Sequence, residues 1–216
     1  MASVFFGWEF GGGLGHLTRF LPIARRLYDK GHIVTLAVRD LEKARPVLAK
    51  TFPDDTSGAA AKHQLRIVES AKWLSAGEPG QRKMPVHSLA DAMCVFDYQR
   101  LPLLTKMVQT WSDLLDQSQP DLIVGDFAPT LRLAHLGSAP FLMVGNGYTI
   151  PPPARLLPPI RPWQEKLQPF SRANEAGILQ SLNIVRRRAK GQRVDFVADV
   201  LNGDHKWIFT IPEFDP

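Results

Sequence analysis

The segment covering residues 4–40 constrains the fold more than any other part of the sequence. Residues 3–9 are mostly apolar and predict a buried strand, and residues 32–38 are rich in β-branched side chains and predict a second one. A glycine-rich turn at residues 11–16 leads into a helix over residues 16–30, whose apolar side chains recur every three or four positions. This order predicts two parallel strands joined by a crossover helix.

The same alternation continues through the rest of the chain. Further strands are expected at residues 65–69, 121–126, 140–145 and 206–210, and helices at residues 40–50, 87–117, 130–136 and 163–191. Asp40 is expected to cap the second helix, Pro102 to kink or split the third, and Gly177 marks a place where the last can break. The alternation predicts an α/β fold with a Rossmann-like, mostly parallel sheet and helices on both faces.

Composition excludes several classes of protein. The chain has 216 residues, 44% hydrophobic and 22% charged, which is typical of a globular protein. The single cysteine, Cys94, excludes an internal disulfide framework and a cysteine metal cluster, and it fits a cytoplasmic setting. No apolar run approaches the ~20 residues of a membrane span, and we expect no signal peptide. We also expect no nucleic-acid partner.

The charge of the chain is basic and unevenly distributed. The formal net charge is +5, and much of the excess lies in residues 186–193. Such a run is most often a solvated helix face. The alternative is contact with an anionic membrane surface or an acidic ligand.

The glycine-rich turn does not fit the two common phosphate-binding fingerprints. In the dinucleotide fingerprint G-x-G-x-x-G, the sixth position counted from Gly11 is His16. Counted from Gly13 it is Thr18, so neither frame fits, and no Gly-Lys-Ser/Thr follows as a P-loop requires. Asp40 ends the second predicted strand, where an acid binds the ribose in Rossmann proteins, although helix capping also explains it. A nucleotide or NAD(P) site therefore stays open as an alternative.

His16 and Asp126 are the predicted catalytic pair. Both follow predicted parallel strands, so both should lie at the carboxyl edge of the sheet, where open α/β sheets bind ligands. Histidine accepts a proton near neutral pH, and a carboxylate that holds one ring nitrogen stabilises the imidazolium that forms. The alternative for His16 is a backbone hydrogen bond at the start of its helix, and for Asp126 a cap on the following helix.

The remaining candidates for chemistry are weaker. Five other histidines show no metal-ligand spacing, so no metal site is predicted: His32, His63, His87, His135 and His205. There is no Gly-x-Ser-x-Gly elbow, and Cys94 lies in a helical stretch without an evident base. Four large apolar side chains either line a pocket beneath a long loop at residues 70–86 or pack in the core: Trp73, Met84, Met93 and Phe96.

Several segments together resemble the N-terminal half of GT-B glycosyltransferases. Three of them resemble the first motif of that fold: residues 15–16 (GH), 21–27 (LPIARRL) and 30–35 (KGHIVT). Three more resemble later segments, the last of them just before the inter-domain linker: residues 120–126 (PDLIVGD), 139–141 (APF) and 211–215 (IPEFD). The likeness is strongest to nucleotide-sugar-dependent family 1 enzymes and to undecaprenyl-linked muramyl-peptide transferases.

The resemblance implies a division of roles between two domains. In such enzymes the N-terminal domain binds the acceptor and the C-terminal domain binds the nucleotide-sugar. Residues 1–210 would then form an acceptor-binding Rossmann-like domain, and residues 211–216 would begin a linker to a donor domain outside these 216 residues. No cofactor-binding residue can be named here, and no cofactor is expected, because the nucleotide-sugar is a substrate.

The resemblance also assigns roles to residues. His16 would remove a proton from an acceptor hydroxyl, whose oxygen attacks the anomeric carbon as the diphosphate leaves, and Asp126 would stabilise the imidazolium. Such a reaction inverts the anomeric configuration. Gly13 and Gly15 would let the backbone approach the reacting groups. Two residues before a proline-rich loop are expected to help bind the acceptor: Asn146 and Tyr148.

The implied function is that of the acceptor-binding half of an inverting hexosyltransferase, inactive without a donor domain. Its partner would be a small-molecule or lipid acceptor, and the donor domain would be either a continuation of the same chain or a separate subunit. Two alternatives stay open: a nucleotide- or NAD(P)-binding Rossmann protein, and a non-catalytic binding subunit of a split transferase.

Overall fold

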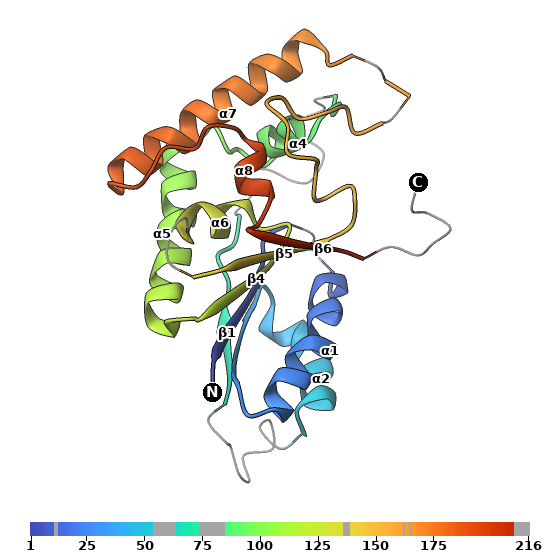
Figure 1. Ribbon diagram of the computed structural model, residues 1–216, viewed down its shortest axis with the longest axis vertical. Coiled ribbons are helices and arrows are strands. Elements are labelled where there is room, and N and C mark those ends of the chain that lie inside the picture. The colour runs from blue at the N-terminus through green and yellow to red at the C-terminus, as the bar shows by residue number, and fades with distance from the viewer. Residues whose placement is uncertain are drawn as a thin grey trace.

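The protein is built on one six-stranded parallel sheet (Figure 1). The computed structural model describes residues 1–10, 13–53, 64–73, 85–135, 139–161, 163–164 and 166–209. The strands are β1 (Ser3–Trp8), β2 (Ile33–Val38), β3 (Leu65–Glu69), β4 (Leu122–Asp126), β5 (Phe141–Gly145) and β6 (His205–Ile208). Their order is β3-β2-β1-β4-β5-β6, and every adjacent pair is parallel. The predicted α/β class and parallel sheet are confirmed.

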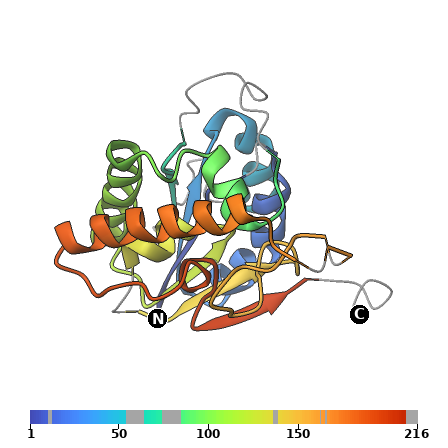
Figure 2. The ribbon, with the colours of Figure 1, turned by 90° about the horizontal axis from the view of Figure 1, so that it is seen from above.

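Helices connect the strands and cover both faces of the sheet (Figures 1 and 2). The helices in the described part of the chain are α1 (Gly15–Asp29), α2 (Leu41–Thr51), α4 (Leu89–Val95), α5 (Leu101–Ser118), α6 (Pro129–His135), α7 (Pro169–Arg188) and α8 (Ala198–Leu201). Helices α1 and α2 pack on one face, and α4, α5, α6 and α8 lie on the other, with α7 outside them against α4 and α5. None of these helices combines the length and apolarity that a bilayer span requires.

Each face of the sheet has its own hydrophobic core. On the α1 side, Leu17 and Phe20 are completely buried and pack with Phe6 and other alternate side chains of the strands. On the opposite side, Trp111 of α5 is completely buried and its ring meets the ring of Phe5 edge-on, with 6.2 Å between centroids. A sheet covered on both faces needs largely apolar strands, which explains why β1, β2, β4 and β5 read as near-continuous hydrophobic runs.

Most predicted elements are present, with one correction. The helical stretch predicted at residues 87–117 is split into α4 and α5, which confirms the second of the two outcomes expected near Pro102, and Pro102 stands in the first turn of α5, where its missing N–H costs nothing. The helix predicted at residues 163–191 begins only at Pro169, and it continues through Gly177 without a break. Buried neighbours on both sides of Gly177, such as Glu175 before it and Ile178 after it, hold that helix in place. Asp40 caps α2 as predicted, because its side chain accepts a hydrogen bond from the N–H of Lys43.

Two facing glycines allow dense packing at the centre of the sheet. Gly7 of β1 and Gly125 of β4 are paired in register. A Cβ atom on Gly125 would lie 2.6 Å from Cζ of Phe141, and one on Gly7 would lie 2.8 Å from Cδ2 of Leu131. Because Phe141 and Leu131 are fully buried, neither has room to move away.

We therefore expect Gly125→Ala to destabilise the protein by about 1–3 kcal/mol through overpacking against Phe141. Thermal unfolding followed by circular dichroism measures this, and for a chain of this size the melting temperature should fall by roughly 2–12 °C. Gly147→Ala is the matched control, because no protein atom lies within 4 Å of its Cβ position. Equal melting temperatures for Gly125→Ala and the wild type would contradict the packing argument.

Candidate functional site

The candidate site lies at the carboxyl edge of the two central strands. Strands β1 and β4 are neighbours, and Trp8 is paired with Asp126 at their ends. The strand order reverses between them, since the chain moves outward through β2 on one side and through β4 and β5 on the other. Such a switch point leaves a crevice at the carboxyl ends of the strands, which is the usual ligand site of open α/β sheets.

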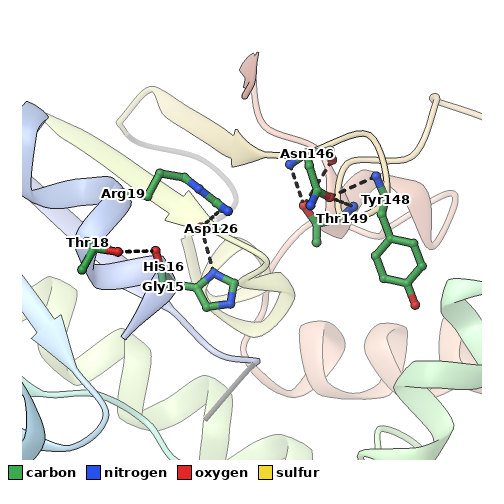
Figure 3. Close-up of polar contacts among 8 residues, drawn as sticks. All are labelled: Gly15, His16, Thr18, Arg19, Asp126, Asn146, Tyr148 and Thr149. Carbon is green, nitrogen blue, oxygen red and sulfur yellow. Dashed lines mark hydrogen bonds and ion pairs between the residues drawn. The ribbon is translucent and has the colours of Figure 1, made fainter. Parts of the chain in front are cut away.

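The structure brings the predicted pair together at this edge (Figure 3). His16 stands in the first turn of α1, and its Nδ1 atom lies 2.8 Å from Oδ2 of Asp126, the last residue of β4. The Asp126 side chain is fully buried, whereas the His16 side chain keeps 20% of its surface exposed. A buried carboxylate therefore lies at ion-pair distance from one ring nitrogen while the imidazole remains accessible from outside.

A third side chain, Arg19, also contacts this carboxylate. Its Nη1 donates a hydrogen bond to the same Oδ2 atom of Asp126 that faces His16. Arg19 lies one turn after His16 on α1, so the two side chains project from one face of the helix. Its guanidinium also lies over the ring of Phe209, 5.8 Å from the centroid. The ion pair with Arg19 offsets the cost of burying the Asp126 charge, and the sequence argument did not anticipate it.

An aromatic ring and a residue with left-handed backbone conformation lie next to the His16–Asp126 pair. The indole of Trp8 is stacked on the His16 imidazole, with 6.4 Å between centroids and 16° between planes. Phe127, directly after Asp126, has φ +46, in the left-handed region that side chains other than glycine rarely adopt. Backbone of this kind is concentrated at functional sites. Its ring lies against Phe10, 4.7 Å between centroids, so β1 and β4 meet through aromatic contacts just beyond the edge.

A buried carboxylate that sequence reasoning missed lies beside the pair. Glu9, directly after β1, is completely buried and accepts hydrogen bonds from Nε1 of Trp73 (3.2 Å) and the hydroxyl of Tyr98 (3.0 Å) on Oε2. Its Oε1 accepts a hydrogen bond from the N–H of Leu131 at 2.7 Å, in the first turn of α6. Burial raises the pKa of Glu9 above its ordinary value, and the hydrogen bonds partly oppose this. The only sign of this site in the sequence was an acidic residue directly after an apolar strand.

Two of the four large apolar side chains for which a pocket or core packing was expected belong to the core. Trp73 and Met93 are buried, so packing rather than a pocket explains them. Phe96 retains 36% exposure and lies against Phe10, with 4.3 Å between ring centroids. Met84 lies outside the described residues.

The predicted acceptor residues occupy a turn after the neighbouring strand (Figure 3). Asn146 follows β5, and its Oδ1 accepts hydrogen bonds from the N–H groups of Tyr148 (3.1 Å) and Thr149 (3.0 Å). This use of Asn146 is structural, because its carbonyl oxygen closes the turn. The Tyr148 side chain is half exposed, at 50%. Within the described residues no hydrogen bond or ion pair links this turn to the His16–Asp126 pair.

Gly13 and Gly15 lie beside open space. Apart from the immediate chain neighbours, no atom of the described residues comes within 4 Å of a Cβ position built on either glycine, so on the described side a ligand can reach the backbone of both. Gly15 begins α1, and its carbonyl accepts a hydrogen bond from the hydroxyl of Thr18. The other two glycines of the predicted turn, Gly11 and Gly12, lie outside the described residues.

The acid that motivated a nucleotide site is already engaged. Asp40 borders a cavity of about 290 Å³ together with Trp8, Gly13 and Arg39. Its carboxylate accepts a hydrogen bond from the N–H of Lys43 and forms an ion pair with Nζ of the same residue at 2.9 Å. These contacts lower the pKa of Asp40, the largest cause being the hydrogen bond with the Lys43 side chain. The capping interpretation thus accounts for this residue. In the described part of the chain no group of three acidic, histidine or cysteine side chains is arranged to hold a metal ion.

Comparison with known proteins shows likeness in structure and not in sequence. No protein-family profile and no curated protein matches the chain. The crystal structure of SsfS6, a glycosyltransferase from Streptomyces sp. SF2575, covers 99% of this chain with a TM-score of 0.55 and 16% identity. The structure of the glycosyltransferase of kitacinnamycin covers 93% with a TM-score of 0.53 and 17% identity. The chain spans about half the length of these structures, 52% and 43% respectively, and it has the α/β Rossmann-like fold of that part.

Proposed function

We propose that this chain forms the acceptor-binding half of an inverting glycosyltransferase, with His16 as the general base. The observation that carries the proposal is the distance of 2.8 Å between Nδ1 of His16 and the buried Oδ2 of Asp126, at the carboxyl edge of a parallel sheet. The fold shared with parts of two glycosyltransferases supports it. The sequence resemblance to family 1 enzymes and to muramyl-peptide transferases points the same way.

The proposed reaction uses the two nitrogens of His16 differently. Nδ1 faces Asp126, so Nε2 carries the free electron pair and accepts the proton of an acceptor hydroxyl. The acceptor oxygen then forms a bond to the anomeric carbon of a nucleotide-sugar, and the bond from that carbon to the diphosphate breaks, which inverts the configuration. Asp126 stabilises the imidazolium through Nδ1 and fixes the plane of the ring.

The acceptor and the donor would reach this site from different parts of the assembly. The accessible side of His16, the open space beside Gly13 and Gly15 and the exposed Tyr148 provide a surface for a small-molecule or lipid acceptor. The nucleotide-sugar would be held mainly by a donor-binding domain or subunit outside this chain. This chain covers about half the length of the similar structures, which supports that division.

The experiment that tests the proposal combines the chain with its donor-binding partner, as a longer product of the same gene or as a co-purifying subunit. Release of nucleoside diphosphate is measured with a panel of nucleotide-sugars and acceptors, and the anomeric configuration of the product is determined by NMR. We expect inversion. A product of retained configuration would reject His16 as a base acting by direct displacement.

The chain alone is expected to transfer sugar no faster than the uncatalysed background, because direct displacement needs donor and base held together. The same assay, run on the purified 216 residues, measures this. Acceptor binding, followed by ligand-observed NMR, should remain. Sustained turnover by the isolated chain would contradict the assignment of the donor site elsewhere. Acceptor binding without transfer, even with the partner present, would favour a non-catalytic binding subunit.

A further inference from the structure

The whole net charge of the protein lies in one quarter of the chain. Residues 151–200 contain nine lysines and arginines and four acids, and the other residues contain seventeen of each. The formal charge of +5 therefore belongs to this segment. In the fold it forms one outer face, made of α7, the chain that returns beside it, and the stretch at residues 151–161 (Figure 2).

Two adjoining hollows run along α7 on this face. They measure about 700 and 870 Å³, and they share Ala176, Leu179 and Arg193. Four exposed arginines line them: Arg155, Arg172, Arg187 and Arg193. Among the described residues no carboxylate forms an ion pair with any of these four. A groove that gathers cations without pairing them is complementary to anionic groups.

The acids that the structure describes on this face do not neutralise the groove. Glu175 is buried, and both its oxygens accept a hydrogen bond from the N–H of Leu157. Asp199 is engaged by the N–H groups of Asp195 and Phe196. Asp195 is the one exposed acid along the lining of the two hollows.

Large apolar side chains project from the same face. Leu156 and Phe196 line the groove and are 41% and 39% exposed. Trp163 is 77% exposed and Phe170, at the start of α7, is 36% exposed. Cationic side chains mixed with exposed aromatic and aliphatic ones are what an interfacial protein surface needs, since the apolar groups enter the lipid boundary while the arginines meet the headgroups.

We propose that this face, comprising α7, residues 151–161, Trp163 and residues 189–196, docks on the surface of a bilayer that contains anionic phospholipids. These four arginines bind lipid phosphates along the groove, and Trp163, Leu156 and Phe196 insert at the headgroup level. A soluble polyanion would satisfy the charges but would leave the exposed apolar side chains in water. The proposal stands independently of the glycosyltransferase function, because it uses none of the residues at the His16 edge.

Vesicle co-sedimentation tests the charge contribution. The full chain is mixed with vesicles of phosphatidylcholine alone or with about one-third phosphatidylglycerol, at low and high salt. Binding is expected only to the anionic vesicles, and it should weaken with salt. The double variant Arg187→Glu/Arg193→Glu should lose at least about tenfold in affinity. Lys30→Glu/Lys50→Glu is the matched control, because it makes the same change in net charge at exposed positions of the opposite face and should bind like the wild type.

A second pair of variants tests the apolar contribution and separates a membrane from a polyanion. Trp163→Ala should weaken vesicle binding several-fold, whereas Trp207→Ala, which removes an exposed tryptophan from β6, should not. A short DNA duplex serves as a non-lipid polyanion. Equal binding to neutral and anionic vesicles, equal loss in both double variants, or binding to DNA without binding to vesicles would each overturn the proposal. Circular dichroism melts show that each variant is folded.

Discussion

Replacing His16 with alanine is expected to lower the turnover number of the complete transferase by roughly 10²–10⁴-fold, the range that positioned general bases contribute. The imidazole is a proton acceptor that is both positioned and exposed, through the 2.8 Å contact with buried Asp126 and 20% remaining exposure. Without it the acceptor hydroxyl must lose its proton to water. The measurement is the rate of nucleoside diphosphate release at saturating acceptor, so that binding and chemistry are separated.

The choice of acceptor sharpens this test. A phenol that is already ionised at the assay pH needs no base, so His16→Ala should reduce its transfer far less than that of an aliphatic alcohol. His205→Ala is the matched control, because His205 is exposed on β6 and should leave both rates unchanged. An equal loss for alcohol and phenolate acceptors would show that His16 positions substrate instead of removing a proton. An unchanged rate for alcohols would remove it from the mechanism.

The fold could be predicted from the sequence because it depends on the local pattern of hydrophobic residues. A buried parallel strand must be apolar throughout and a surface helix must be apolar on one side, so β1, α1 and β2 could each be placed from hydrophobic periodicity. The first residues of helices that follow long loops were harder to predict. The helix predicted from residue 163 begins at Pro169, because tertiary packing of α7 on α4 and α5, and not propensity, decides where it starts.

Only part of the candidate site could be predicted from the sequence. His16 and Asp126 could be paired from sequence because the ends of parallel strands share one edge. Arg19 could not be assigned to Asp126, since a long side chain on an exposed helix has many reachable partners. The role of Glu9 could not be predicted either, for a different reason. Its partners Trp73, Tyr98 and Leu131 come from segments far away in the chain, and no local spacing reports such a convergence.

Replacing Glu9 with alanine is expected to cause the largest loss of stability in the molecule, about 3 kcal/mol or more. The change leaves three buried donors without an acceptor: Nε1 of Trp73, the hydroxyl of Tyr98 and the N–H of Leu131. It also opens a cavity beneath the first turn of α6. Urea unfolding measures the loss, and the melting temperature should fall by roughly 6–12 °C. Glu42→Gln, at an exposed position on α2, is the control and should stay within about 0.5 kcal/mol of the wild type.

The conservative variant Glu9→Gln adds a pH dependence with a definite sign. Burial, the largest cause, raises the pKa of Glu9 in the folded state above its ordinary value of 4.5, so the folded state binds this proton more tightly than the unfolded state. The contribution of Glu9 to stability is therefore fully present below 4.5 and is lost as the pH rises through the folded-state pKa. Glutamine does not titrate, so the stability of the wild type relative to Glu9→Gln should decrease across that interval. A difference that increases with pH would mean that hydrogen bonding to Trp73, Tyr98 and Leu131 outweighs desolvation, and that Glu9 is ionised at less cost than its burial implies.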